Sequence, residues 1–269
     1  AIACPATALD LDDIDEEIDE IRKQLGALTT DACAPEIRLY WKGEGQTLAG
    51  LAADLKDDPR QRREVDQWRM TALDGMASLF AGEFDAARLH TDKALPLGRE
   101  PWGEAGVVVH GLVHLIVDVL SDELGAESLQ RWRGIAEAIP SDSMRATLAW
   151  VEALVGDDAR ACHLLDSVAP RLALLSDNFM GGFGLVGFAE AAVALDRSDQ
   201  FPRIREVLTP LADRMLGHPW APSYAAAHAL ARVETALGET EPAAAHRIAA
   251  GELYERLSAS SFAEQLSRV

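Results

Sequence analysis

The sequence predicts an all-α protein, built as a right-handed α-solenoid of antiparallel helix hairpins, and three observations lead to that class. Apolar positions recur with the helical period of 3.6 residues, and no sustained alternation of apolar and polar residues marks a strand. Alanine and leucine, which favour helices, dominate the chain, whereas aromatic residues make up only 6% of it. Helix breakers recur at regular intervals, which is typical of helical repeats.

The first 60 residues predict less regular helices. One helix is expected over about 10–25, with an apolar stripe on one side and acidic residues on the other. A second is expected over about 35–56, where the glycines of Gly43-Glu44-Gly45 can break it. The sequence Asp57-Asp58-Pro59 predicts a turn before the regular part of the chain.

From residue 62 to residue 257 the pattern predicts four to five helix hairpins. The connections are short, so consecutive helices must be antiparallel. The expected helices span residues 62–81, 84–97, 102–124, 127–139, 143–155, 159–175, 183–195, 202–216, 223–237 and 242–257. Residues 262–269 predict the start of a further helix, and residues 1–269 are expected to form one helical-repeat domain.

The hairpin turns are periodic, and small residues recur around them. If Gly82, Gly125, Gly156, Asp196 and Gly238 are equivalent, the spacings are 43, 31, 40 and 42 residues. Small residues recur at fixed offsets from these turns: Gly75, Ala149, Ala189 and Ala231 seven residues before, Ala87, Ala161 and Ala243 five after, and Ala94 and Ala250 twelve after. Small side chains let two helices approach closely, so we expect neighbouring units to stack.

One unit resembles the tetratricopeptide repeat. The stretch from Gly75 through Gly82, Phe84 and Ala87 to Ala94 resembles the consensus small-x6-Gly-x-aromatic-x2-Ala-x6-Ala. No proline closes the unit at its usual place, and Phe201 occupies an expected alanine position in the fourth unit. We therefore describe the repeats as tetratricopeptide-like.

A narrower resemblance covers about residues 35–269. Five stretches, 68–73, 79–84, 146–150, 188–195 and 254–262, resemble the C-terminal helical-repeat region of large actinobacterial ATP-binding transcriptional regulators of the LuxR-type, SARP-like and adenylate-cyclase-associated classes. In that family a nucleotide-binding module precedes the repeats and a DNA-binding domain lies elsewhere. This sequence contains neither GxxxxGK[ST] nor an evident basic recognition helix. The resemblance therefore implies a sensor or interaction arm, separated from its effector parts.

Composition and charge exclude several classes of function. With 25 basic and 44 acidic residues the formal net charge is −19, which argues against direct contact with nucleic acid. No apolar run is long enough to cross a membrane, and the N-terminus does not resemble a signal peptide. The three cysteines, Cys4, Cys33 and Cys162, fit reduced thiols, so a cytoplasmic location is expected. The first residue is not Met, so we expect an excised domain or a processed chain.

His110 and His114 are the strongest candidates for chemistry. They lie four residues apart on one predicted helix, with Asp118 one turn further, so three candidate metal ligands share a face. The spacer lacks the Glu of an HExxH motif. We therefore favour groove-lining or packed histidines over a metal site, and we expect no cofactor.

The concave face of the solenoid is the predicted binding surface. The first helix of each pair lines that face, which places Trp68, Trp102 and Trp150 there together with His110 and His114. An apolar groove for a peptide or small ligand is one interpretation, and packing of the tryptophans in the core is the other.

Two further patterns have alternative interpretations. The glycine-rich stretch 179–187 can cradle a phosphate group, but a flexible helix entry or close packing between units is favoured over phosphate binding. The basic cluster of Arg60, Arg62 and Arg63 fits a solvated surface better than a binding patch. No nucleophile motif is present, so no catalytic residue is assigned.

The sequence thus predicts a non-catalytic interaction or regulatory module of a bacterial transcriptional regulator. Its partner would be a protein or peptide, an ATPase or DNA-binding domain of the same regulator, or a second copy in a homodimer. A small-molecule sensing domain is the alternative, and a helical metal-dependent enzyme is a third hypothesis. Because an open solenoid lacks a cap, we also expect Leu253, Leu257 and Phe262 to be exposed at its C-terminal end. This end should promote self-association or be followed by a further repeat in the intact protein.

Overall fold

The computed structural model describes residues 40, 43, 50, 64–177, 181–218 and 220–268. The predicted helix over 10–25 and nearly all of the one over 35–56 lie outside these residues, as do Cys4, Cys33 and the arginine cluster at 60–63. Cys162 is a free thiol.

The described part of the chain is mostly helical, which confirms the all-α class at that level. The α-helices are α4 (Glu64–Ala81), α5 (Phe84–Trp102), α6 (Glu104–Leu120), α7 (Ala126–Ala138), α8 (Asp142–Val155), α9 (Asp158–Val168), α10 (Gly181–Ala194), α11 (Phe201–Leu208), α12 (Ala226–Leu237), α13 (Thr240–Arg256) and α14 (Ser260–Leu266). Short 3-10 helices are η1 (Ala169–Asp177), η2 (Ser198–Gln200) and η3 (Thr209–Leu211). Two strands, β1 (Met215–His218) and β2 (Ala221–Ala225), complete the fold.

Several helices end at residues that adopt the left-handed backbone conformation. Gly82, Gly156, Asp196 and Gly238 have φ values of +79°, +115°, +52° and +75°, and each ends a helix where the sequence predicts a hairpin turn. The predicted equivalence of Gly125 is wrong. Gly125 has φ −151° and caps the start of α7, while Asp122 is the left-handed residue of that turn.

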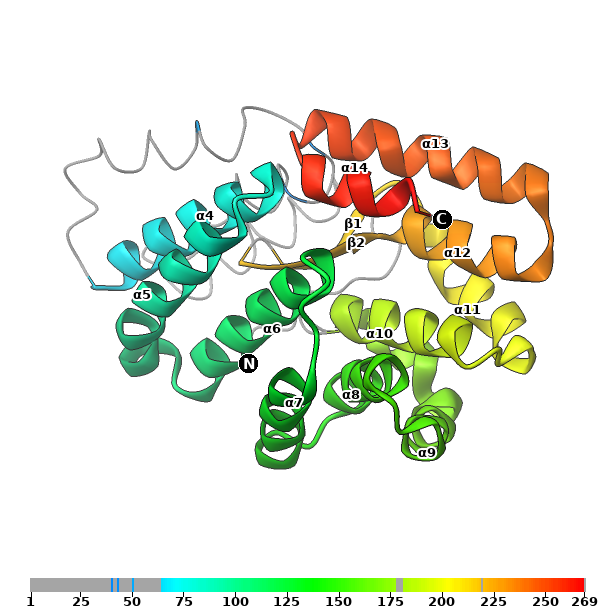
Figure 1. The fold of residues 1–269 in the computed structure, drawn as a ribbon, viewed down its shortest axis with the longest axis horizontal. Coiled ribbons are helices and arrows are strands. Elements are labelled where there is room, and N and C mark those ends of the chain that lie inside the picture. Colours follow the sequence, from blue (N-terminus) through cyan, green and yellow to red (C-terminus); the bar gives the residue numbers. More distant parts are fainter. Residues whose placement is uncertain are drawn as a thin grey trace, which may run out of the picture.

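The helices form a closed circuit. Successive helices pack on one another from α4 onwards, and the last one, α14, packs back on α4 and α6 (Figure 1). The Ser261 hydroxyl donates a hydrogen bond of 2.6 Å to the Leu79 carbonyl, and Arg268 pairs with Asp122 at 2.9 Å. We use the term helix circuit for α4 to α14 joined by this contact.

The prediction of an exposed apolar C-terminal end is wrong. Leu253, Leu257 and Phe262 are all buried, because α14 covers the end of α13 and is itself covered by α4. The start of a helix predicted at 262–269 is present as α14, which begins two residues earlier and ends at Leu266.

A β hairpin occupies a region where the sequence predicts two helices. β1 and β2 are antiparallel, with Met215 opposite Ala225 and His218 opposite Ala221. The predicted helices over 202–216 and 223–237 are therefore shortened to α11 and α12. Pro210 accounts for the early end of α11, because proline removes a backbone N–H donor and clashes with the preceding helical turn.

The hairpin lies inside the helix circuit and completes its core. β2 is buried along its whole length, and the two strands contact α6, α10 and α12 (Figure 1). Trp220 meets Trp68 edge to face with ring centroids 4.7 Å apart, and Tyr224 meets Trp150 at 5.8 Å. The backbone N–H of Ser223 donates to the hydroxyl of Tyr40 at 3.0 Å.

The glycine-rich stretch packs helix on helix where the structure describes it. Gly184 and Gly187 belong to α10 and lie against α8. A Cβ atom would lie 2.7 Å from the Cα of Ser143 at position 184, and 2.9 Å from the Cα of Thr147 at position 187. Only glycine allows so close an approach of two backbones, so the close-packing interpretation is confirmed.

Candidate functional site

Ionisable side chains are concentrated where α5 and α6 lie side by side. The two helices are antiparallel and in contact, so residues spaced by one turn on each helix face one another. We call this the α5–α6 seam, and it consists of Asp85, Arg88, Asp92, His110, His114, Asp118, Ser121 and Glu123.

Asp92 and the two histidines meet at one end of the seam. Oδ1 of Asp92 lies 2.9 Å from Nε2 of His110 and 3.0 Å from Nε2 of His114. The two imidazole rings are neighbours, with centroids 4.5 Å apart. His114 is buried, His110 is partly buried and the Asp92 side chain is 60% exposed, so the cluster lies at the edge of the core and reaches solvent.

The environment of this cluster shifts two of its pKa values. Partial burial opposes ionisation of Asp92, but hydrogen bonds and charge from His110 and His114 outweigh it and lower the pKa of the carboxyl group. Burial, followed by the neighbouring His110, lowers the pKa of the His114 imidazole below its ordinary value. Asp92 is therefore ionised and His114 neutral at pH 7.

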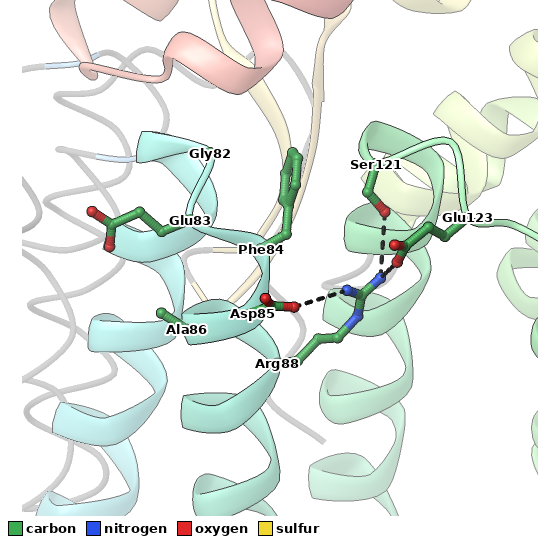
Figure 2. Close-up of a pocket in the computed structure, with 8 residues that line it drawn as sticks. All are labelled: Gly82, Glu83, Phe84, Asp85, Ala86, Arg88, Ser121 and Glu123. Atoms are coloured by element: carbon green, nitrogen blue, oxygen red, sulfur yellow. Dashed lines mark hydrogen bonds and ion pairs between the residues drawn. The ribbon is translucent and has the colours of Figure 1, made fainter.

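Arg88 organises the other end of the seam. Its Nη2 donates to Oδ1 of Asp118 at 3.1 Å and to the Ser121 hydroxyl at 3.3 Å, and it also pairs with Glu123. Its Nη1 lies 3.7 Å from Oδ1 of Asp85. Figure 2 shows Arg88 turned toward Asp85 on its own helix and toward Ser121 and Glu123 across the gap between α5 and α6.

Asp118 belongs to this arginine network and not to the histidine cluster. Its Oδ2 accepts a hydrogen bond of 2.7 Å from the Ser128 hydroxyl and lies 3.6 Å from Nη1 of Arg131. The predicted trio of His110, His114 and Asp118 is therefore corrected, because Asp92 of α5 lies beside the histidines in the position expected for Asp118.

A surface depression of about 520 Å³ opens beside Arg88. Its lining comes from the turn between α4 and α5, the first turn of α5 and the C-terminal end of α6: Gly82, Glu83, Phe84, Asp85, Ala86, Arg88, Ser121 and Glu123. The lining has three carboxylates and one guanidinium, so it is negatively charged. Glu123 and Asp85 are both exposed and lie on either side of Arg88 (Figure 2).

The other residues predicted for a ligand groove lie elsewhere. Trp68 and Trp150 are buried against the β hairpin, which favours the alternative of core packing. The side chain of Trp102 lies outside the described part of the structure.

Asp92 is the site residue that the sequence prediction missed, although a signal for it exists. Asp92 and His114 are each 11 residues from Gly103, which separates α5 from α6. Two antiparallel helices place residues at equal distances from their turn opposite one another. The helix boundaries alone therefore bring Asp92 to the histidines.

Comparisons with family models, with curated proteins and with solved structures found no match to this chain. Fold and site together define a mostly helical protein with an internal β hairpin and a polar seam between two of its helices. Among the described residues, no helix has the length and hydropathy that crossing a membrane requires.

Proposed function

We propose that this chain is a non-catalytic interaction module that binds a basic segment of a protein partner at the depression beside Arg88. The observation that carries this proposal is the acidic lining of that depression. Asp85 at the start of α5 and Glu123 after the end of α6 present exposed carboxylates on either side of Arg88, and Glu83 adds a third. These three acidic groups exceed the single charge of Arg88, so the lining attracts a Lys or Arg side chain of a partner.

The charge of the whole chain supports a basic partner. A formal net charge of −19 attracts a cationic surface over distances longer than a hydrogen bond and repels an acidic one. Complementary charge of this kind raises the association rate and selects against wrong partners.

The intact protein is proposed to be a bacterial transcriptional regulator with tetratricopeptide-like repeats. This follows from the resemblance of residues 35–269 to the helical region of such regulators, together with the antiparallel pairs α4–α5, α8–α9 and α12–α13. The DNA-binding domain of such a regulator carries basic surface, so it has the charge that the acidic depression requires. An ATPase domain of the same regulator and a second copy of the chain are the other partners to test.

A labelled lysine-rich peptide tests the proposal directly. We expect the peptide to bind the full chain, and the double variant Asp85→Asn/Glu123→Gln to weaken binding by roughly fivefold, because each exposed ion pair contributes about 0.5 kcal/mol. Fluorescence anisotropy at several salt concentrations measures both the affinity and its electrostatic part.

The control is the double variant Glu252→Gln/Glu255→Gln, which removes the same charge from exposed positions on α13. If the control weakens binding as much as Asp85→Asn/Glu123→Gln does, the affinity depends on the net charge of the chain alone. The depression would then not be the binding site.

A small-molecule sensing domain is the second candidate. It is favoured by the volume of the depression, since about 520 Å³ falls within the range of roughly 300–1,000 Å³ typical of small-molecule sites. A ligand that raises the melting temperature of the native chain, but not that of Asp85→Asn/Glu123→Gln, would favour this candidate.

A further inference from the structure

Three candidate metal-ligand atoms converge at the histidine end of the α5–α6 seam. The Nε2 atoms of His110 and His114 and a carboxylate oxygen of Asp92 all lie within 4.8 Å of one another. A tetrahedral Zn²⁺ site with bonds of about 2.0–2.1 Å separates its ligand atoms by about 3.3 Å. Oδ1 of Asp92 is already 2.9 and 3.0 Å from the two nitrogens, so only small side-chain movements separate this arrangement from a complete site.

The backbone holds these ligands in place before any ion binds. His110 and His114 are four residues apart on α6 and so share one face of that helix, while Asp92 extends from α5. The packing of α5 against α6 fixes the distance between the two backbones. A ligand set that is ordered in advance loses little conformational entropy when it binds an ion.

The cluster is also open to solvent on one side. The exposed Asp92 side chain leaves one side of the cluster accessible to solvent, from which an ion and a water ligand can enter.

We infer that Asp92, His110 and His114 bind one divalent transition-metal ion with a fourth, solvent-facing position. Two imidazoles and one carboxylate match the ligand preference of Zn²⁺ and Co²⁺, whereas Mg²⁺ and Ca²⁺ prefer oxygen ligands alone. The ion links α5 to α6. This site is independent of partner binding at the depression, so it stands or falls separately from the proposed function.

Cobalt provides the most specific test, because tetrahedral Co²⁺ has a characteristic visible absorption. The full chain, stripped with a chelator, is titrated with Co²⁺ alone and then with Zn²⁺ alone. We expect one equivalent of Co²⁺ to develop the tetrahedral spectrum, Zn²⁺ to displace it, and one equivalent of Zn²⁺ to raise the melting temperature.

Two variants and a matched control assign the site. Asp92→Asn and His110→Gln each remove a ligand, and each should weaken Co²⁺ binding by at least about tenfold and abolish the tetrahedral spectrum. His90→Gln, on α5 and close to α4, removes a histidine near the cluster and should change neither.

Three results would overturn the site: no cobalt spectrum in the native chain, unchanged binding in both ligand variants, or an equal loss in His90→Gln. His110 is only partly buried, so we expect His110→Gln to fold. This second variant therefore still tests the site if Asp92→Asn lowers the stability of the chain. Circular dichroism of the metal-free variants confirms that each one is folded.

Discussion

Phe262 of α14 packs edge to face against Phe80 of α4, with ring centroids 5.4 Å apart. The two residues belong to the first and last helices of the helix circuit, so their contact joins its ends. Hydroxyl groups of α14 strengthen the junction, because Ser260 and Ser261 both donate hydrogen bonds to the carbonyl of Phe80.

Removal of the Phe262 ring should destabilise the whole protein. Phe262 is fully buried, so Phe262→Ala leaves a cavity where α4 and α14 meet, and we expect the free energy of unfolding to fall by about 3–5 kcal/mol. Urea denaturation measures the change. Ile248→Ala is the control, because the Ile248 side chain is 64% exposed and its loss should change stability by less than about 0.5 kcal/mol. Equal effects would show that the junction contributes little.

Two glycines should respond to alanine in opposite directions. At Gly187 a Cβ would lie 2.9 Å from the Cα of Thr147 and force α10 away from α8, so Gly187→Ala should cost about 1–3 kcal/mol. Gly134 is exposed within α7 with no atom near its missing Cβ, so Gly134→Ala should stabilise by about 0.5–1 kcal/mol. Thermal melts of both variants decide this, and stabilisation by Gly187→Ala would contradict the close contact.

Acid should destabilise the fold through His228. Burial lowers the pKa of this imidazole to about 3, whereas its ordinary value is 6.5. As the pH falls, His228 is therefore protonated in the unfolded chain before it is protonated in the folded protein. Its contribution to the free energy of unfolding is fully present above pH 6.5 and is lost as the pH falls toward 3. Between pH 7 and 5 the loss amounts to about 2 kcal/mol.

The variant His228→Asn separates this effect from other titrations. Asparagine can replace Nδ1 as the partner of the Tyr254 hydroxyl, but it does not titrate. Urea denaturation at pH 7 and at pH 5 should show a smaller acid-induced loss in the variant, by about 2 kcal/mol. Carboxyl groups with lowered pKa values, such as Asp142, lose their contribution at lower pH. Parallel losses in both proteins would exclude His228 as the cause.

The Tyr254 hydroxyl should be needed for the junction between β2 and α12. It accepts the N–H of Ala225 at 3.0 Å and shares a hydrogen bond with His228. Tyr254→Phe leaves that buried N–H without the hydroxyl, so we expect a loss of about 1–3 kcal/mol. Ser267→Ala removes an exposed hydroxyl that follows α14 and donates to the Glu264 carbonyl in the last turn of that helix, so it should have almost no effect. Chemical denaturation compares the two.

Much of the helical structure follows from local sequence signals. The helical period and the left-handed turn residues Gly82, Gly156, Asp196 and Gly238 locate most helix ends to within a few residues. The β hairpin was not predicted, because its strands lie inside the molecule and depend on contacts with helices distant in the sequence. Pro219 and Pro222 were the local signals against helix there.

The site was predictable in part. The spacing of His110 and His114 brings them together on one helix, which sequence alone indicates. The choice between Asp92 and Asp118 depends on Arg88, whose charge attracts Asp118 to the opposite end of the seam. The burial of Trp68 and Trp150 depends on the hairpin, so it could not be read from helical periodicity.

The closing contact between α14 and α4 constrains the number of helices in the circuit. An open array can gain or lose a unit at either end, because each unit touches only its neighbours. In this protein an extra hairpin between α4 and α14 would move Phe262 away from Phe80 and uncover both rings. Related chains of different length should therefore vary in their loops or outside the circuit, and not in the count of hairpins within it.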